Sequence, residues 1–575
     1  MSKKTEFENI TEFKDIKEIL YNSAKKFNEK IAFVIKNKIG KEINYTNISY
    51  TKLLEDVNSL GTAFYSIGLR NKRIAIIGKN RYEWEITNLS NLLGSIVSVP
   101  LDKDLQIDEL ENSLIRSKAN AIVFDPKLQD KIEEIKQGNK TEIKEYICMD
   151  SNQGYLSIPE LLEKGEKLVK EGNKEFINNE IDENTMNVLL FTSGTTSESK
   201  AVMLSHKNMA SNIYALQCVE DVRPTDTNIA FLPYHHIFGS VGQLMMLACG
   251  VKTAFPDGLR YVKQNMQEYK VSIFIVVPIL TEAMYKAIQK EIEKQGKTKL
   301  VNTMIKISNS LLKCHIDIRR KIFKQILDNL GGELRLIISG GAAADPFYIK
   351  GFKNFGVETV QGYGLSETGP VIAAENYFFQ KPGSVGLPMK NVKVEIANKD
   401  ENGIGEIKVK GPNVMLGYYK RVDLTNEAIK DGWFYTGDLG FIDEDGALHI
   451  TGRNKNLIVL KNGKKVFPEE LEKLINRMNI VSECMVFGMP DKVDKNDVKL
   501  SVKVVFDKET IEEKYSDKTD EELYKIMWEQ IKELNTTFPR YKYIKNLIIS
   551  HEELIKTTTK KIKRHEEMAK ILKTN

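Results

Sequence analysis

Cysteine is scarce in this chain of 575 residues, and the five that occur lie far apart: Cys148, Cys218, Cys249, Cys314 and Cys484. No Cys-x-x-Cys pair and no Cys/His cluster is present. The sequence therefore excludes a disulfide framework and gives no indication of a structural zinc site. We expect buried, reduced thiols.

Long hydrophobic runs and an excess of one charge are also missing. The longest apolar run, Val271–Leu280, is about half of the ~20 residues that a bilayer span needs. The first residues show no apolar core of a secretory signal. Lysine and arginine number 84 against 79 aspartates and glutamates, a formal charge of +5, which gives no general case for nucleic-acid binding. We expect a cytoplasmic protein without a nucleic-acid partner.

Short β-rich runs alternate with helical patterns over the first three quarters of the chain. The whole is too long for one core, because single cores rarely grow past ~250–300 residues. The predicted strands are Ile31–Ile35, Arg73–Gly78, Ser95–Leu101, Ala121–Asp125, Glu145–Asp150, Val188–Phe191, Ser272–Pro278 and Leu334–Ser339. Helical patterns such as Tyr50–Ile67 and Lys207–Gln217 lie between several of them. This alternation favours an α/β fold of layered subdomains with largely parallel sheets.

The pattern changes near Gly383, where close-spaced turns and alternating apolar residues predict an antiparallel, β-rich subdomain. Beyond Arg453 a second α/β pattern begins, with a helix over Pro468–Met478 between predicted strands. We therefore predict a large N-terminal domain, residues 1–454, and a small C-terminal α/β domain, residues 455–575.

One segment, Val301–Leu330, has a basic helical pattern. Its apolar residues fall near one helical stripe, and its lysines and arginines lie mostly elsewhere. A basic amphipathic helix can lie on an anionic membrane surface. Such a stripe more often packs on the protein's own body, so peripheral contact with the inner face of the membrane and plain packing both stay open.

A loop of small hydroxyl and glycine residues follows the predicted strand Val188–Phe191. It comprises Thr192, Ser193, Gly194, Thr195, Thr196 and Ser197, with Lys200 after it. Small residues let the backbone approach an anion closely, hydroxyl and N–H groups donate to phosphate oxygens, and the lysine adds positive charge. The residue order of a Walker A loop is absent. A flexible turn could share this composition, but so long a polar run after a strand favours a phosphate loop.

This loop resembles the phosphate loop of the AMP-forming synthetase superfamily, which includes acyl-CoA synthetases, luciferases and the adenylation domains of peptide synthetases. The family's usual form ends in Gly-x-Pro-Lys-Gly. Here Ser197, Ser199 and Ala201 occupy the small positions, and Lys200 is kept. The resemblance implies that Thr192–Lys200 holds the phosphates of ATP.

Two further elements follow in the family's order. FLPYHHIFG places His236 at the position that borders the carboxylate substrate in relatives. A hydrogen-bonded core histidine is the plain alternative. LIISGGAA resembles the strand and turn that lie against adenine, with Gly340, Gly341 and Ala342 in the turn.

QGYGLSETGP resembles the family's Tyr-Gly-x-Thr-Glu element, with a serine in place of the threonine. The resemblance implies that Tyr363 stacks on adenine, that Ser366 reaches the phosphates and that Glu367 binds Mg²⁺. A carboxylate is a suitable oxygen ligand for Mg²⁺. The nucleotide-binding residues of this element are Gly362, Tyr363, Gly364 and Ser366. A glycine turn that serves packing alone would look similar.

The next elements lie in GWFYTGDLG and in the segment that starts at Thr451. The resemblance implies that Asp438 accepts both ribose hydroxyls, which suits the two oxygens of a carboxylate, and that Arg453 adds a ribose or phosphate contact. It further implies that Lys455 is the hinge of a mobile C-terminal domain and that Gly463 lines the passage of the thiol acceptor. Taken alone, these segments could be turns with solvated charges.

The last element, KTTTKKIKR at Lys556–Arg564, resembles the family's Lys-Thr-x-x-Gly-Lys-Ile-x-Arg. It places Lys561 on the catalytic lysine, and Lys560 replaces the usual glycine. Composition alone would indicate a solvated basic tail. The ordered elements together extend the resemblance from Tyr50 to Arg564.

The resemblance implies an ATP- and Mg²⁺-dependent ligase that joins an acid to a thiol. Lys561, Glu367 and His236 are the expected catalytic residues, with Glu367 and Thr192 beside the metal ion. The segment from the long basic helix through Leu330–Arg335 looks most like bacterial long-chain fatty acid–CoA ligases, so fatty acid, ATP and coenzyme A are the expected partners. The apolar residues that could line an acyl tunnel, or simply fill a core, are Phe238, Met245, Met246, Val276 and Val277.

Several alternatives stay open. The acceptor could be an acyl carrier protein, and the acid could be shorter or aromatic. A luciferase-like oxidoreductase shares the fold, and fold does not fix function. A non-catalytic nucleotide-binding protein is a different class, which the presence of Lys561, Glu367 and Asp438 argues against.

Overall fold

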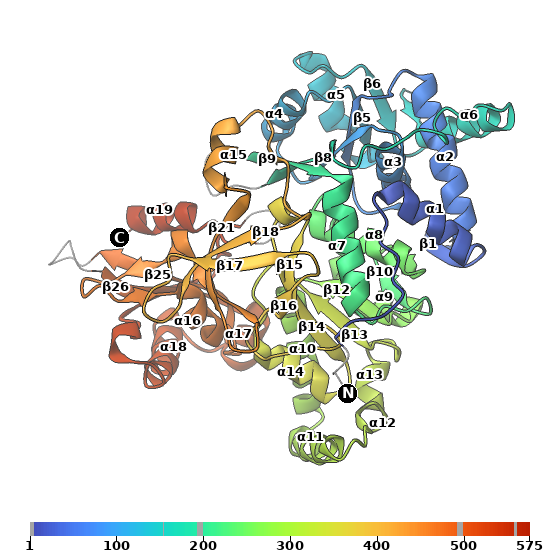
Figure 1. Cartoon of the computed structure of the whole chain (residues 1–575). Helices are drawn as coiled ribbons and strands as arrows, with labels where there is room; N and C mark the ends of the chain where they lie inside the picture. Colours follow the sequence, from blue (N-terminus) through green and yellow to red (C-terminus); the bar gives the residue numbers. More distant parts are fainter. Residues whose placement is uncertain (1–4, 153, 193–198, 491–497, 557–560, 575) are drawn as a thin grey trace.

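The computed structural model describes residues 5–152, 154–192, 199–490, 498–556 and 561–574 (Figure 1). The predicted α/β fold is confirmed, and each strand predicted in the first three quarters has a counterpart. Among the described residues, no helix is long and apolar enough to cross a membrane. Of the predicted phosphate loop, the residues outside the described ranges are Ser193, Gly194, Thr195, Thr196 and Ser197.

An eight-stranded sheet organises the first part of the chain, in the order β19-β9-β8-β4-β3-β5-β6-β7. The strands from β8 to β7 run parallel, and β9 and β19 are antiparallel additions. Its strands are β3 (Arg73–Ile77), β4 (Val97–Leu101), β5 (Ala121–Phe124), β6 (Glu145–Cys148), β7 (Leu156–Ser157), β8 (Met186–Thr192), β9 (Lys200–Ser205) and β19 (Gly417–Tyr418).

Helices cover both faces of this sheet, which explains its nearly continuous hydrophobic strands. Ile74 and Ile76 of β3 pack in one cluster with α2 and α3, whereas Ala75 and Ile77 pack with α4 and α5 on the other face. The helices are α1 (Ile16–Phe27), α2 (Tyr50–Ser66), α3 (Tyr82–Leu93), α4 (Ile107–Ser117), α5 (Gln129–Gly138) and α6 (Ile158–Lys170). A capping box of Ser157 and Glu160 starts α6.

A second sheet has the order β12-β13-β14-β15-β16. Its first three strands are parallel, so their carboxyl ends meet at one edge, and β15 and β16 then add antiparallel. The strands are β12 (Ile273–Val276), β13 (Leu336–Ser339), β14 (Glu358–Gly364), β15 (Val371–Ala374) and β16 (Leu387–Pro388). The neighbouring helices are α7 (His206–Val219), α8 (Ile237–Ala248), α9 (Val262–Tyr269), α10 (Pro278–Lys294) and α14 (Pro346–Asn354).

Two smaller sheets complete the large part of the molecule. One joins β10 (Thr227–Ile229), β11 (Lys252–Ala254), β1 (Ile31–Ile39) and β2 (Glu42–Ser49). The other confirms the predicted antiparallel region. It contains β17 (Lys393–Ala397), β18 (Gly405–Lys410), β20 (Ile429–Lys430), β21 (Trp433–Ile442) and β22 (Leu448–Arg453), with α15 (Val422–Ala428) beside it.

The C-terminal segment has a hydrophobic core of its own, formed by residues between Ile458 and Ile549. Its sheet is β25 (Val481–Pro490), β26 (Val498–Phe506) and β27 (Asn546–Ser550), and a short ladder joins β23 (Ile458–Val459) to β24 (Lys465–Val466). Its helices are α16 (Pro468–Ile475), α17 (Lys508–Lys514), α18 (Asp520–Asn535) and α19 (Arg564–Thr574). Figure 1 shows this segment beside the β17–β22 region.

The single helix predicted over Val301–Leu330 is wrong. The chain forms α11 (Thr298–Lys313), α12 (Arg319–Ile322) and α13 (Lys324–Asp328), and His315 in the break has a positive φ of 60°. The residues of the predicted apolar stripe therefore do not share one environment. Phe323 and Leu327 are buried in the core, whereas Ile316 is exposed. A continuous helix would have kept these side chains on one face, and the break turns them apart.

The expectation of buried thiols holds for only part of the set. Cys148, Cys218 and Cys484 are buried, Cys249 is partly buried, and Cys314 is exposed at the end of α11. Burial raises the pKa of Cys249 to about 12, so this thiol stays protonated at neutral pH.

Candidate functional site

One large cleft collects the candidate residues. Its volume of about 4190 Å³ exceeds the ~300–1,000 Å³ of an ordinary small-molecule site, so it has room for several ligand groups. Every candidate catalytic, nucleotide-binding and hinge residue that the structure describes lines it: Thr192, Lys200, His236, Gly340, Gly341, Ala342, Gly362, Tyr363, Gly364, Ser366, Glu367, Asp438, Arg453, Lys455, Gly463 and Lys561.

The two ends of the predicted phosphate loop are fixed by the antiparallel pair β8 and β9. Thr192 lies opposite Lys200, and the Thr192 hydroxyl donates to the Lys200 carbonyl oxygen at 3.3 Å. The Lys200 ammonium lies over the Tyr418 ring, 4.5 Å from its centre. Arg116 donates to the Ser199 hydroxyl and carbonyl at 3.1 and 2.7 Å. The chain therefore brings a lysine and a hydroxyl to the cleft at the base of this loop.

Glu367 lies in a 3₁₀ turn, Ser366–Thr368, directly after β14. The Tyr418 hydroxyl donates to Glu367 Oε1 at 2.9 Å, and the Met415 backbone N–H donates to the Glu367 carbonyl at 2.9 Å. Burial, and then the Glu367 charge, raises the pKa of Tyr418, so this phenol remains a donor. Among the described residues, no hydrogen bond to Glu367 Oε2 occurs. A fixed carboxylate with an available oxygen at the cleft fits a Mg²⁺ ligand.

Tyr363, Asp438 and Arg453 form a second connected group in the lining of the cleft. Asp438 of β21 lies opposite Arg453 of β22, and Arg453 Nε lies 2.9 Å from Asp438 Oδ1. The Tyr363 hydroxyl donates to Asp438 Oδ2 at 2.7 Å. Asp438 is only 4% exposed. Both carboxylate oxygens therefore have partners that fix their direction.

Lys561 projects into the same cleft from the C-terminal segment. It keeps access to solvent, but protein surrounds it so closely that burial lowers the pKa of its ammonium, and Arg453 lowers it further. The carboxylates of Asp438 and Glu367 act in the opposite direction. Lys561 thus lies within electrostatic reach of both candidate nucleotide carboxylates.

Contacts on both sides of Lys561 hold its backbone. Lys563 N–H donates to the Ile555 carbonyl at 2.8 Å, and Ile555 N–H donates to Glu567 Oε2 at 2.9 Å. Arg564 pairs with the buried Glu472 at 2.6 Å. Lys556, at the start of the same element, forms an ion pair with Glu483 at 3.0 Å. These contacts fix the chain on either side of Lys561 at the cleft.

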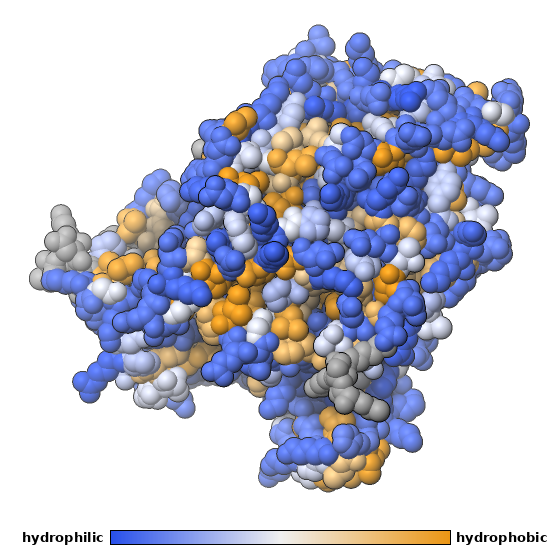
Figure 2. Space-filling model, in the orientation of Figure 1, coloured by the Kyte–Doolittle hydropathy of each residue, from blue (hydrophilic) through white to orange (hydrophobic). Residues whose placement is uncertain are grey.

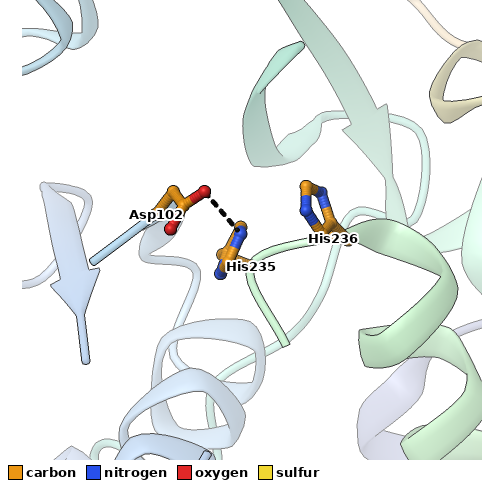
Figure 3. Close-up of side chains that lie close together, drawn as sticks. All are labelled: Asp102, His235 and His236. Atoms are coloured by element: carbon orange, nitrogen blue, oxygen red, sulfur yellow. Dashed lines mark ion pairs between the residues drawn. The ribbon is translucent and has the colours of Figure 1, made fainter. Parts of the chain in front are cut away.

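His236 caps the start of α8, with His235 and Asp102 beside it (Figure 3). His235 lies between the other two. Its Nε2 is 3.3 Å from Asp102 Oδ2, and the two imidazole rings are 4.2 Å apart. Burial lowers the pKa of His236 to about 3, and the neighbouring His235 adds to the effect. His236 is therefore neutral at physiological pH and can accept or donate a hydrogen bond at the cleft.

Asp102, His235 and His236 have the residue types of a metal site. Within the described ranges they are the one group of three such side chains whose ligand atoms lie within 4.8 Å of one another. Lys561 also acts on His236 as a nearby positive charge, which disfavours a metal cation there. We therefore interpret Asp102 and His235 as a close polar pair packed beside His236.

The apolar wall of the cleft lies between α7, α8 and the β12–β14 edge. Of the five candidates for an acyl tunnel, Phe238, Met245 and Val277 line it. Phe238 packs over Gly340, where an added Cβ would come within 2.9 Å of the ring. Met246 and Val276 are fully buried core residues instead. Met245 and Met246 are neighbours on a helix and point about 100° apart, and Val277 lies just beyond the end of β12. The hydrophobicity of these segments does not reveal which residue faces the cleft.

Ion pairs join the C-terminal segment to the body of the molecule. Arg477 makes two contacts with Asp345, at 2.6 and 2.7 Å, and Asp345 is buried at the N-cap of α14. Lys290 of α10 lies 3.2 Å from Glu509 and 3.0 Å from Glu513. These contacts hold the segment in the position that delivers Lys561.

Sequence reasoning missed three contributors to the site: Tyr418, the Asp102–His235 pair and the Asp345–Arg477 pair. Tyr418 reaches Glu367 because β19 adds to the edge of β9. That pairing joins segments more than two hundred positions apart, so no local pattern signals it. Asp102 directly follows the predicted strand Ser95–Leu101, and its place at a strand end was the available clue.

Comparisons with known proteins agree with this architecture. A family model described as AMP-binding enzyme matches residues 20–419, and the model of an AMP-binding enzyme C-terminal domain matches residues 455–571. The rat long-chain-fatty-acid–CoA ligase 5 is 29% identical over 478 residues, covering 77% of this chain and 69% of that protein. A chloroplastic long-chain-fatty-acid–[acyl-carrier-protein] ligase of Arabidopsis thaliana is 25% identical over 552 residues, covering 83% and 75%.

A solved structure supports the fold in the same way. The anthranilate CoA ligase AuaEII, in complex with anthranoyl-AMP, superposes with a TM-score of 0.76 at 19% identity. The match covers 97% of this chain and 98% of that one. At this identity the likeness concerns the fold.

Proposed function

Since the chain belongs to the AMP-binding enzyme family, we propose that it is an AMP-forming acid–thiol ligase that activates long-chain fatty acids for transfer to coenzyme A. The observation that carries this proposal is the convergence of Lys561, Glu367 and Asp438 on one cleft. These groups come from three separate segments of the chain. The long-chain fatty acid ligases among the relatives support a long-chain fatty acid as the substrate. These relatives include both a CoA ligase and an acyl-carrier-protein ligase.

In the first half-reaction a carboxylate oxygen attacks the α-phosphorus of ATP. A new P–O bond forms, the bond to pyrophosphate breaks, and an acyl-adenylate remains. No protein nucleophile is needed, so the work is positioning and charge neutralisation. Lys561 would neutralise charge between the two reactants. The outer phosphates would be held by the Thr192–Lys200 loop, which includes Ser193, Gly194, Thr195, Thr196 and Lys200. His236 would border the acid.

The remaining nucleotide contacts follow from the same cleft. Asp438 and Arg453 would bind the ribose, and Tyr363 would lie against adenine with the glycine turn at Gly340. Glu367, with Thr192 nearby, would hold Mg²⁺, which supplies positive charge to the phosphates when bound. The Tyr418 hydroxyl orients the Glu367 carboxylate for that purpose.

In the second half-reaction the thiol sulfur attacks the acyl carbonyl, the thioester forms and AMP leaves. We place the hinge of the C-terminal domain at Lys455, so that rotation removes Lys561 and brings the Gly463 loop to the adenylate. Gly463 has a φ of 76°, which favours glycine in this loop. The Asp345–Arg477 contacts have to break for this rotation.

Pyrophosphate release tests the proposed function. We expect release with ATP, Mg²⁺ and acids in a panel from acetate to oleate, highest with long chains, and AMP with thioester only when coenzyme A is added. Adenylation without coenzyme A thioester, followed by transfer to an added acyl carrier protein, would favour the carrier-protein ligase. A preference for short or aromatic acids would keep the ligase reaction but replace long-chain fatty acids as the proposed substrate. No pyrophosphate from any acid would contradict the ligase and favour a non-catalytic nucleotide-binding protein.

We also propose that the tip around α11 contacts anionic membrane from the cytoplasmic side. Residues 294–324 contain nine lysines and arginines and one aspartate, a formal charge of +8, while the whole chain carries +5. Five of the lysines are exposed and have no ion pair among the described residues: Lys297, Lys299, Lys306, Lys313 and Lys321. Leu300, Ile307 and Ile316 beside them are about half exposed, at 52%, 52% and 51%.

The geometry of α11 suits an interface between water and lipid. Leu300 and Ile307 are seven residues apart and share one face, and Lys299 and Lys306 repeat the spacing on the next flank. Figure 2 shows apolar side chains among hydrophilic ones at the foot of the molecule, where Figure 1 places α11. Each lysine near an anionic surface contributes about 1 kcal/mol. A fatty acid substrate partitions into the same membrane.

Vesicle flotation tests this contact. We expect the protein to bind vesicles of phosphatidylcholine with phosphatidylserine, but not phosphatidylcholine alone, and to dissociate at high salt. K299E/K306E should weaken binding about tenfold or more, whereas the control K25E/K72E, on other exposed lysines, should not. Equal binding to neutral vesicles, or concentration-dependent dimerisation that the α11 changes abolish, would overturn the proposal.

A further inference from the structure

The apolar side of the cleft contains a deeply buried acid, Glu220, that the proposed chemistry does not use. Glu220 directly follows α7, and its backbone N–H donates to the Leu216 carbonyl at 2.9 Å. It lines the cleft and is 4% exposed. A carboxyl this deeply buried is unusual unless something pairs with it.

The surroundings of Glu220 are an apolar channel wall. Leu216, one turn earlier, packs with Met245, Ile275 and Val360 in one hydrophobic cluster, and all four residues line the cleft. Space in the channel depends on Gly242, because a Cβ there would lie 3.1 Å from Ile275 Cδ1. The wall thus runs from Phe238 and Gly340, next to His236, toward the end of α7.

Among the residues that the structure describes, none pairs with the Glu220 carboxyl. Within the described residues it makes no side-chain hydrogen bond and no ion pair, and Glu375 beside it in the cleft lining has one unpartnered buried oxygen, Oε2. Burial, and then the negative charge of Glu375, raises the pKa of Glu220 to about 8. Asp221 and Glu358 act in the same direction. Glu220 is therefore mainly a neutral hydrogen-bond donor at neutral pH.

We propose that Glu220 forms the polar far end of the acyl channel and selects acids by the group at the end remote from their carboxylate. This inference rests on the proposed function, since it concerns the acid of that reaction. A chain that stops short of Glu220 leaves the carboxyl hydrated. When the terminal methyl group of a longer chain reaches the Glu220 carboxyl, it displaces the hydrating water and offers no hydrogen bond in exchange. A hydroxyl end of the same length accepts from the carboxyl and keeps it satisfied.

A purely structural role makes a different prediction. An acid that held the fold through buried contacts would destabilise the protein when replaced. Because Glu220 has no such contact, E220L should leave the melting temperature unchanged or raise it. E220Q keeps a hydrogen-bonding end of similar size and is the matched control.

The test compares saturated fatty acids with ω-hydroxy acids of equal length, from eight to eighteen carbons. For the wild type we expect kcat/KM for methyl-ended acids to fall once the chain reaches Glu220. The hydroxy acid should then be preferred by about tenfold to a hundredfold. E220L should remove or reverse that preference, and E220Q should keep it. The proposal would be overturned if the wild type had the same kcat/KM for the methyl-ended and hydroxyl-ended acids at every chain length. It would also be overturned if E220L kept the wild-type preference.

Calorimetric binding of the same acid pairs separates this inference from the proposed function. If the wild type releases no pyrophosphate with any acid but binds the hydroxy acid more tightly, the reaction assignment fails and the Glu220 assignment stands. If pyrophosphate is released and both binding and kcat/KM ignore the remote end, only the Glu220 assignment fails. The wild-type comparison needs no variant, so it decides even if E220L folds poorly.

Discussion

Lys561→Ala is expected to slow acyl-adenylate formation by about 10²–10³-fold. Lys561 supplies a positive charge within electrostatic reach of Asp438 and Glu367 in the cleft, where charge would develop as pyrophosphate leaves. Loss of one preorganised donor at such a position costs roughly this factor. In the proposed second half-reaction the rotated C-terminal domain would have taken Lys561 out of the cleft, so thioester formation from supplied acyl-adenylate should continue.

Two assays divide these effects: pyrophosphate release from ATP and acid, and thioester formation from synthetic acyl-adenylate and coenzyme A. Lys570→Ala is the matched control, because Lys570 pairs with Glu552 on the surface of the same domain. Equal loss in both assays would contradict the assigned role. A pH profile adds a second readout. Since burial lowers the pKa of Lys561, adenylation should decline on the alkaline side before pH 10.5, as the ammonium loses its proton.

The fold was predictable from sequence to the extent that local patterns determine it. Strands such as β3 and β5 are buried on both faces, so continuous Ile and Val runs between turn residues identify them. The antiparallel region after Gly383 was also predictable. The break after α11 was not, because the positive φ at His315 and the inward turn of Phe323 depend on the core that they meet.

The candidate site divides in a similar way. Ordered motifs identified Lys561, Glu367 and Asp438, and the structure places all three on one cleft. The partner that fixes Glu367, Tyr418, depends on pairing between distant strands and has no motif. For the apolar wall of the cleft, the sequence predicted only that the residues are hydrophobic and not which of them face the cleft. Met245 lines the cleft and Met246 lies in the core, although they are neighbours with the same side chain.

Asp438→Ala should weaken ATP binding by about 10–100-fold with little effect on affinity for the acid. The substitution removes two acceptor oxygens that the structure directs with Tyr363 at 2.7 Å and Arg453 at 2.9 Å. Hydrogen bonds to a charged group contribute about 1.5–3 kcal/mol, and 1.4 kcal/mol is tenfold in affinity. Asp438→Asn keeps one oxygen acceptor and loses the charge, so its effect should be smaller.

Calorimetry with ATP and kinetics with each substrate varied in turn would measure this effect. Asp423→Ala is the control, since Asp423 pairs with Arg421 on the surface. Burial, and then the Asp438 charge, raises the pKa of Tyr363, so its hydroxyl stays a donor and loses its acceptor in the alanine variant. Arg453 would also lose its partner and could turn toward the phosphates. Unchanged ATP affinity in a folded Asp438→Ala protein would therefore mean that the ribose lies elsewhere, and the Tyr363–Asp438–Arg453 group would then be a structural brace between β14, β21 and β22.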